Sequence, residues 1–104
     1  MIIKTLRVMR GDTLCFGLEF DGLDQDLDSA YFSVSETYGS PYIFQKSLNN
    51  GIIKNNTNEY IVAISPEDTS QEIGRYNYDL QIGVNDDIFT IMMGPFMIER
   101  DITV

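Results

Sequence analysis

The segment most informative for the fold is SPEDTSQEIGRYNYDLQI, residues 65–82, which joins a helix start to an alternating strand. Ser65 can cap a helix, the proline after it suits the first helical position, and Asp68 can complete a capping box. Gly74 suits the end of such a turn. The segment therefore predicts one short helical turn near residues 66–72, placed between two strands.

The second half of this segment alternates with a period of two residues, which is typical of a half-buried strand. Tyr76 and Tyr78 fall on one face, whereas Asp79 falls on the other. In immunoglobulin-like sandwiches, a tyrosine placed like Tyr76 donates its hydroxyl to the backbone of the preceding loop. We therefore expect a structural corner rather than a catalytic or metal-binding cluster. Its members are Ser65, Asp68, Gly74, Tyr76 and Tyr78.

The same alternation recurs along the rest of the chain, and turn residues separate the alternating segments. Examples are TLCFGLEF (13–20), SAYFSVSE (29–36) and EYIVAI (59–64). Asn50-Gly51 is a strong hairpin signal, because both residues tolerate a positive φ. The pattern predicts an all-β protein, namely an antiparallel Ig-like β-sandwich of 7–9 strands in a single domain over residues 1–104.

The composition restricts the chemistry that this chain can perform. It has 104 residues, a formal net charge of −9, no histidine, and Cys15 as its single cysteine. The charge disfavours nucleic acid as a partner. Catalytic triads that use histidine and metal sites built from cysteines are excluded. We therefore expect no enzymatic activity and no cofactor.

Two alternatives concern the acidic residues. Asp21, Asp24, Asp26 and Asp28 lie within one turn, but their spacing does not match a calcium-binding EF-hand loop, so a solvated turn is favoured and calcium is the weaker reading. A carboxylate-only hydrolase drawing on Asp68, Glu72 and Asp79 is the least favoured reading, because nothing in their spacing demands it.

The sequence contains no apolar run of about 18 residues, so it predicts no membrane insertion. Lys4 and Arg7 interrupt the apolar start, which argues against a signal peptide. We therefore expect synthesis in a cytoplasm.

Two groups of side chains are candidates for an interface with a partner. Three tyrosines surround the YGSP loop, and tyrosine gives amphipathic contact area at low entropic cost. The segment FTIMMGPFMI, residues 89–98, is apolar on both faces, which fits either burial or a subunit interface. The candidate interface residues are Tyr31, Tyr38, Tyr42, Phe89, Ile91, Met93 and Phe96.

Three quoted stretches also carry a family resemblance. RGDTLCFGLEFDG (10–22), the segment from Gly51 to Ile82 with its PEDT and GRYNYDLQ motifs, and FTIMMGPFMIERDIT (89–103) resemble a recurrent phage pattern. The resemblance is to Ig-like domains in tail and baseplate upper proteins of phages and prophages of Gram-positive bacteria. It extends from about Arg10 to Thr103, and its motifs are structural.

The resemblance implies a non-enzymatic structural or assembly module of a phage or prophage particle, working through protein–protein contacts. It implies synthesis in the bacterial cytoplasm and a final location in the virion. The implied partners are other virion or tail proteins, or further copies of this chain. The alternative is a cell-surface carbohydrate- or protein-binding β-sandwich module for host adhesion, using the region of Tyr31, Tyr38 and Tyr42.

Overall fold

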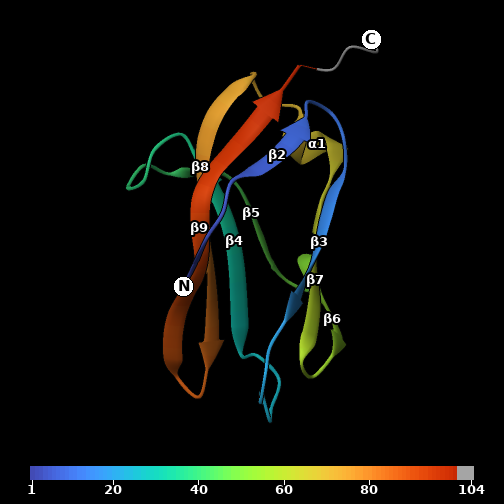
Figure 1. Ribbon diagram of the computed structural model, residues 1–104, viewed down its shortest axis with the longest axis vertical. Helices are drawn as coiled ribbons and strands as arrows, with labels where there is room; N and C mark the ends of the chain where they lie inside the picture. The colour runs from blue at the N-terminus through green and yellow to red at the C-terminus, as the bar shows by residue number, and fades with distance from the viewer. Residues whose placement is uncertain (101–104) are drawn as a thin grey trace.

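The computed structural model describes residues 1–100 as an all-β protein with nine strands and one short helix (Figure 1). The strands are β1 (Ile2–Ile3), β2 (Leu6–Met9), β3 (Leu14–Glu19), β4 (Ser29–Ser35), β5 (Tyr42–Leu48), β6 (Gly51–Asn56), β7 (Glu59–Ile64), β8 (Gly74–Val84) and β9 (Asp87–Glu99), and the helix is α1 (Pro66–Thr69). The strand count lies within the predicted range, and the helix is shorter than the predicted turn. Residues 101–103, the closing part of the family resemblance, lie outside the described residues.

The strands form one mixed sheet in the order β1-β9-β8-β4-β5-β6-β7-β3, with β2 also paired to β9. The sheet curls into a half-barrel. We call β1, β2, β9, β8, β4 and β5 the large arm, and β6, β7 and β3 the small arm. Figure 1 shows β9, β8 and β4 on one side of the molecule and β3, β7 and β6 on the other. Within residues 1–100, the strand pairing that joins the arms consists of two residue pairs between β5 and β6.

The prediction of a fully antiparallel arrangement is wrong, because three strand pairs are parallel. These pairs are β1–β9, β2–β9 and β5–β6. The N-terminal strand must end near α1, where the chain crosses to the small arm, and β9 ends there as well. The Arg10 side chain and backbone hold this end, donating to the carbonyls of Gln71 at 2.9 Å and Glu99 at 2.8 Å.

The prediction of a β-hairpin at Asn50-Gly51 is also wrong. A sharp turn does form, with φ of 64° at Asn49 and 99° at Gly51. However, β5 and β6 leave this turn in parallel, because β6 pairs mainly with β7 in the small arm. The turn therefore transfers the chain between arms. A long hairpin forms instead at Asn85 and Asp86, which join β8 to β9 with φ of 54° and 68°.

The core lies between the two arms and is built from the inward residues of strands in both arms. Phe32 of the large arm is its centre and is fully buried. Its ring packs on Phe16 of the small arm at 5.8 Å, on Tyr78 at 5.3 Å and on Phe96 at 6.2 Å. Aromatic pairs of this geometry contribute about 0.5–1.5 kcal/mol each beyond the burial of apolar area.

Gly94 permits the N-terminal segment to lie directly on β9. A Cβ atom at this position would be 2.3 Å from the carbonyl oxygen of Lys4. The Lys4 amide donates to the carbonyl of Met93 at 3.0 Å, and the hydroxyl of Tyr78 donates to the carbonyl of Lys4 at 2.6 Å. A side chain at residue 94 would therefore separate these backbones.

Within residues 1–100, no helix is long and apolar enough to cross a membrane.

Candidate functional site

The corner predicted around Ser65 is a hydrogen-bonded cap of α1. The Ser65 hydroxyl accepts from the amide of Asp68 at 3.3 Å, and the Asp68 carboxylate accepts from the amide of Ser65 at 3.0 Å. The Tyr76 hydroxyl donates to the carbonyl of Glu72 at 2.6 Å. Gly74 begins β8, and Tyr78 is buried in the core. These contacts give the corner residues structural roles.

An ion pair joins this corner to β5. The ammonium of Lys46 lies 2.5 Å from the Asp68 carboxylate, and both side chains are largely buried. Burial alone would raise the pKa of Asp68, but hydrogen bonds from Lys46 and Ser65 outweigh it and hold that pKa below its ordinary value. Lys46 therefore neutralises the capping acid.

The helix α1 also closes one end of the molecule. Thr69 is fully buried, and its hydroxyl donates to the carbonyl of Asp12 at 2.7 Å. The amide of Gly11, at a φ of 83°, donates to the carbonyl of Thr69 at 3.4 Å. The RGD sequence at residues 10–12 is thus a turn that docks on α1.

The acidic loop at residues 21–28 does not form a metal site in this structure. Within residues 1–100, no group of three or more histidine, cysteine, aspartate or glutamate side chains could hold a metal ion. Asp26 instead pairs with Lys54 of β6, with 2.9 Å between the charged atoms. The calcium reading of this loop therefore has no supporting geometry.

The carboxylate-only reading also finds no assembled pair of catalytic acids. Asp68 is engaged in the cap and by Lys46. Asp79 faces the opposite side of the sheet from the core, where burial raises its pKa. Nothing in the described residues provides an activated nucleophile beside either group.

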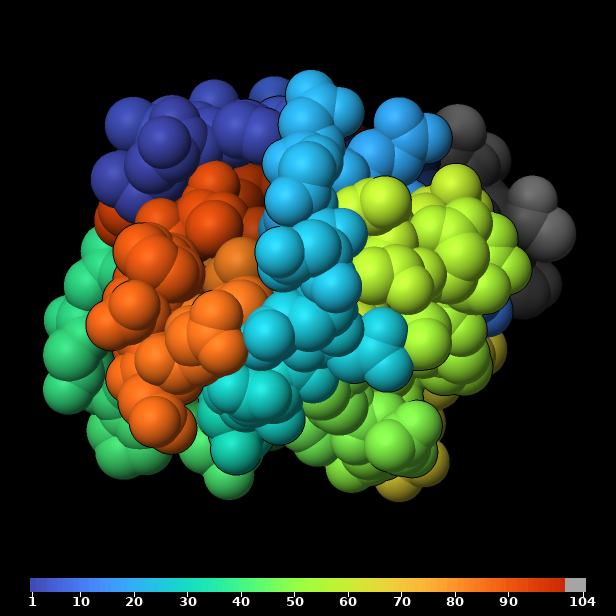
Figure 2. Space-filling model, turned by 90° about the horizontal axis from the view of Figure 1, so that it is seen from below, coloured from blue at the N-terminus to red at the C-terminus, as the bar shows by residue number. Residues whose placement is uncertain are grey.

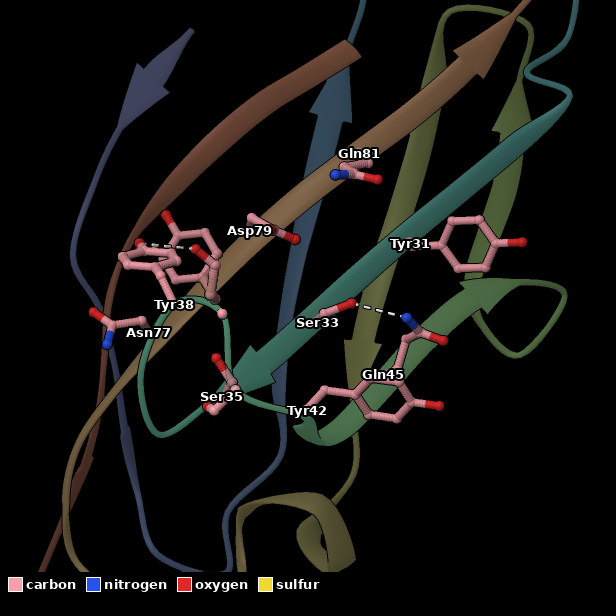
Figure 3. A pocket seen from close by; sticks show the side chains of 12 residues that line it. Tyr31, Ser33, Ser35, Tyr38, Tyr42, Gln45, Asn77, Asp79 and Gln81 are labelled. Carbon is pink, nitrogen blue, oxygen red and sulfur yellow. Dashed lines mark hydrogen bonds between the residues drawn. The ribbon is translucent and has the colours of Figure 1, made fainter. Parts of the chain in front are cut away.

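The three predicted tyrosines gather on the outer face of β4, β5 and β8, around a hollow of about 300 Å³ (Figure 3). Tyr31 lies on β4, Tyr42 on β5 and Tyr38 in the loop between them. A bulge in the β4–β5 pairing places Tyr42 opposite Ser35 on this face. In a regular strand Tyr42 and Phe44 would lie on the same face, so the outward position of Tyr42 comes from the bulge.

Polar side chains of the same hollow were not predicted to join the tyrosines; Asp79 alone had been named, in the carboxylate-only reading. They share the outward positions of β4, β5 and β8, and the alternation along β8 was the signal that could have identified part of the set. They are Ser33, Ser35, Gln45, Asn77, Asp79 and Gln81.

The apolar segment of β9 divides among four environments. Phe96 is fully buried in the core, so it is not available to a partner. Met93 is partly buried opposite Asp79 on the outer face. Phe89 is exposed near the start of β9, and Ile91 lines a second cavity. The predicted interface therefore does not form one continuous surface.

This second cavity, of about 420 Å³, lies where the half-barrel is not closed. We call it the seam, and it separates β3 from β1 and β9. Figure 2 views the molecule from below, with the blue N-terminal residues, the orange C-terminal strands and the cyan segment after β3. The residues lining the seam are Ile2, Lys4, Leu6, Phe16, Gly17, Leu18, Glu19, Phe20, Ile91 and Met92.

In comparisons with known proteins, no family model matches the chain, and no curated protein matches its sequence.

Proposed function

We propose that this protein is a non-enzymatic structural module of a phage or prophage particle, placed in the tail or baseplate, and that it works through protein–protein contacts at the seam. The observation that carries the proposal is an apolar cavity between two strand edges. Such an arrangement suits an extended segment of another chain, which can add main-chain hydrogen bonds and fill the apolar space.

The edge of β3 supports this proposal. Among the described residues, β3 pairs only with β7 and has no second neighbouring strand. The amide of Phe20 donates to the carbonyl of Asn58, which fixes the hydrogen-bonding register of β3 with β7. In an antiparallel pair, alternate residues direct their backbone groups outward. Gly17 is then one of the residues that offer backbone groups to a partner strand.

The apolar lining of the seam is the second support. Phe16 and Leu18 point toward the core but remain partly exposed, because no strand covers them from the side of β9. Ile2 on the opposite edge is 60% exposed. A partner segment that covered these side chains would remove apolar area from water, which contributes about 25 cal/mol per Å².

The proposal also includes the arrangement of the two arms as sheets. We infer an Ig-like sandwich in which the large and small arms are the two facing sheets. The aromatic contact between Phe16 and Phe32 across the core supports this reading, as does the parallel pairing of β2 with β9 beside the β9–β8–β4 strands. The short β5–β6 pairing then marks the passage of the chain from one sheet to the other.

The assembly role is tested by measuring association of the protein with itself over a concentration series by light scattering. We expect association that Ile2→Lys weakens about tenfold, because a charge would enter the seam. The matched control is Ile53→Lys, which changes a similarly exposed residue (55%) on β6 outside the seam. Equal weakening by both variants, or a strict monomer at millimolar concentration, would argue against self-assembly at the seam.

The particle location needs a separate measurement. Immunogold labelling of particles produced by the strain that carries this gene should place the protein in the tail or baseplate. Purified particles that lack the protein would remove the virion part of the proposal.

A further inference from the structure

The hollow on the outer face of the large arm is separate from the seam and has a different chemistry. It lies over β4, β5 and β8, with the β4–β5 loop forming one wall (Figure 3). Its volume of about 300 Å³ is at the lower end of the range for small-molecule sites. Its lining combines aromatic rings with amide, hydroxyl and carboxylate groups, so it suits a small, polar ligand with an apolar face.

The tyrosine side chains of the hollow are exposed to solvent. Tyr31, Tyr38 and Tyr42 are 43%, 48% and 56% exposed. Within residues 1–100, none of the three rings forms an aromatic pair with another ring. In Figure 3, Tyr38 lies on one side of the hollow, and Tyr31 and Tyr42 lie on the other. The rings therefore form separate stacking surfaces rather than a closed aromatic cage.

Tyr38 is fixed in place before any ligand arrives. Its hydroxyl lies 3.3 Å from the carbonyl oxygen of Tyr78 and 3.2 Å from that of Gly94, and it donates to this pair of acceptors. The β4–β5 loop behind it is ordered by hydrogen bonds between Thr37 and Ser40. A wall that is already ordered loses little conformational entropy when a ligand binds.

The floor of the hollow carries an unused acceptor. Asp79 lies between Asn77 and Gln81 on β8, and within residues 1–100 no hydrogen bond or ion pair satisfies its carboxylate. Partial burial raises the pKa of Asp79, because it disfavours the charged form of the carboxyl group. Beside it, the Gln45 amide donates to the Ser33 hydroxyl at 2.9 Å, which orients that pair.

Several ligand classes do not fit this lining. A polyanion would be repelled by the net charge of −9. A metal ion would find one carboxylate here, without a cluster of further acidic or thiol ligands in the described residues. A quaternary ammonium group requires converging aromatic faces, which these tyrosines do not provide. An added peptide strand requires a free edge, whereas β4 is paired on both sides.

A sugar ring matches the remaining features. It has an apolar C–H face that can stack on a tyrosine, and hydroxyl groups at its edge that can donate to a carboxylate and exchange hydrogen bonds with amides and hydroxyls. We propose that this hollow binds a neutral mono- or disaccharide, with Tyr31 or Tyr42 stacking on the ring and Asp79 accepting hydrogen bonds from its hydroxyl groups.

The test is a titration of the ¹⁵N-labelled protein, followed by NMR, with the methyl glycosides of glucose, galactose, mannose, N-acetylglucosamine and rhamnose. A printed glycan array extends the search to larger sugars. We expect at least one sugar to shift the amide signals around Ser33, Asp79 and Gln81 with saturation in the millimolar range. Asp79→Asn should weaken that binding about tenfold, because a hydrogen bond to a charged acceptor is lost.

Matched variants distinguish the hollow from general surface contact. Tyr31→Ala or Tyr42→Ala, whichever removes the stacking ring, should weaken binding about tenfold, and both residues are exposed, so the fold should be retained. Phe89→Ala removes an aromatic ring of similar exposure (50%) outside the hollow and should leave binding unchanged.

Four outcomes would overturn the proposal. The first is the absence of any array signal or shift with all five glycosides. The second is a set of shifts confined to the seam, and the third is equal loss of binding in Phe89→Ala. Binding of tetramethylammonium or a lysine peptide without any sugar would also overturn it. Because the seam shares no lining residue with the hollow, failure here leaves the assembly proposal standing.

Discussion

The Tyr78 hydroxyl donates a hydrogen bond of 2.6 Å to the carbonyl of Lys4, which lies 74 residues earlier in the chain. Tyr78 is almost fully buried, and its ring stacks on Phe32 at 5.3 Å. One side chain thus links the core to the N-terminal segment that lies along β9. The docking of β1 and β2 therefore depends on a residue of the central strand β8.

We expect Tyr78→Phe to lower the free energy of unfolding by about 1–3 kcal/mol, because the Lys4 carbonyl loses its buried donor. Chemical denaturation measures this change. Hydrogen exchange should also show faster exchange at β1 and β2 than at β4. Unchanged stability together with unchanged exchange at residues 1–9 would contradict this role.

The fall in folding stability at alkaline pH should also depend on the Tyr78 hydroxyl. Burial, together with the neighbouring Tyr38, raises the pKa of Tyr78 to about 12 from an ordinary value of 10.0. A raised pKa means that the neutral form is favoured in the folded state, so its contribution is fully present below pH 10 and is lost as the pH rises toward 12. Denaturation at a series of pH values should show this fall, and Tyr78→Phe should show a smaller one.

Tyr76→Phe tests the corner separately. The variant should lose about 1–3 kcal/mol of stability, because the carbonyl of Glu72 loses a hydrogen bond of 2.6 Å. Thermal melting measures the change. An unchanged melting temperature would show that this contact does not hold the corner. In contrast with Tyr78→Phe, exchange at β1 and β2 should stay as in the parent protein.

Gly94→Ala should detach the N-terminal segment, because its Cβ would meet the backbone of Lys4 at 2.3 Å. The expected cost is about 1–3 kcal/mol, as for other overpacked sites. The matched control is Gly74→Ala, because Gly74 has a similar φ (158° against 155°) but nothing within 4 Å of the added atom. Equal losses in the two variants would assign the effect to backbone conformation instead of contact with Lys4.

The Lys46–Asp68 pair should govern stability in acid. Hydrogen bonds from Lys46 and Ser65 overcome the burial of Asp68 and lower its pKa from the ordinary value of 3.8. A lowered pKa means that the stabilisation is present above pH 3.8 and is lost as the pH falls through the folded-state value. In the Lys46→Met variant, the free energy of unfolding should therefore fall less steeply as the pH is lowered in a series of denaturation measurements. An unchanged dependence of the free energy of unfolding on acidic pH would show that the pair does not act on the folding equilibrium.

Salt should strengthen self-association at the seam. Each copy carries a net charge of −9, and salt screens repulsion between like charges over about 8–10 Å at physiological ionic strength. Sedimentation velocity should show tighter association when sodium chloride is raised. Weaker association at high salt would indicate an interface held by ion pairs, in disagreement with an apolar seam.

Local features of this fold could be predicted from the sequence, because they depend on neighbours in the chain. The capping box of Ser65 and Asp68 needs only four consecutive residues. The alternation along β8 needs only the period of a strand, and Tyr76 and Tyr78 do lie on its buried face.

Features that depend on distant segments could not be predicted in the same way. The parallel placement of β2 on β9 is set by where the chain crosses between arms, which no local pattern encodes. The position of Tyr42 depends on a bulge in its own strand, where Ile43 is the extra residue opposite the Val34–Ser35 step of β4. The hollow likewise combines side chains from three strands, so the sequence did not connect its acceptor Asp79 with the tyrosines around it.

The pairing of β9 also has a consequence for the order of folding. The β8–β9 hairpin closes over the short turn at Asn85 and Asp86, so it costs little loop entropy and can form early. The pairing of Val8 with Ile98 spans almost the whole chain and must follow. A newly made chain therefore has a time window in which Gly94 and the edge of β9 await the N-terminal strands, and within that window another copy can take their place.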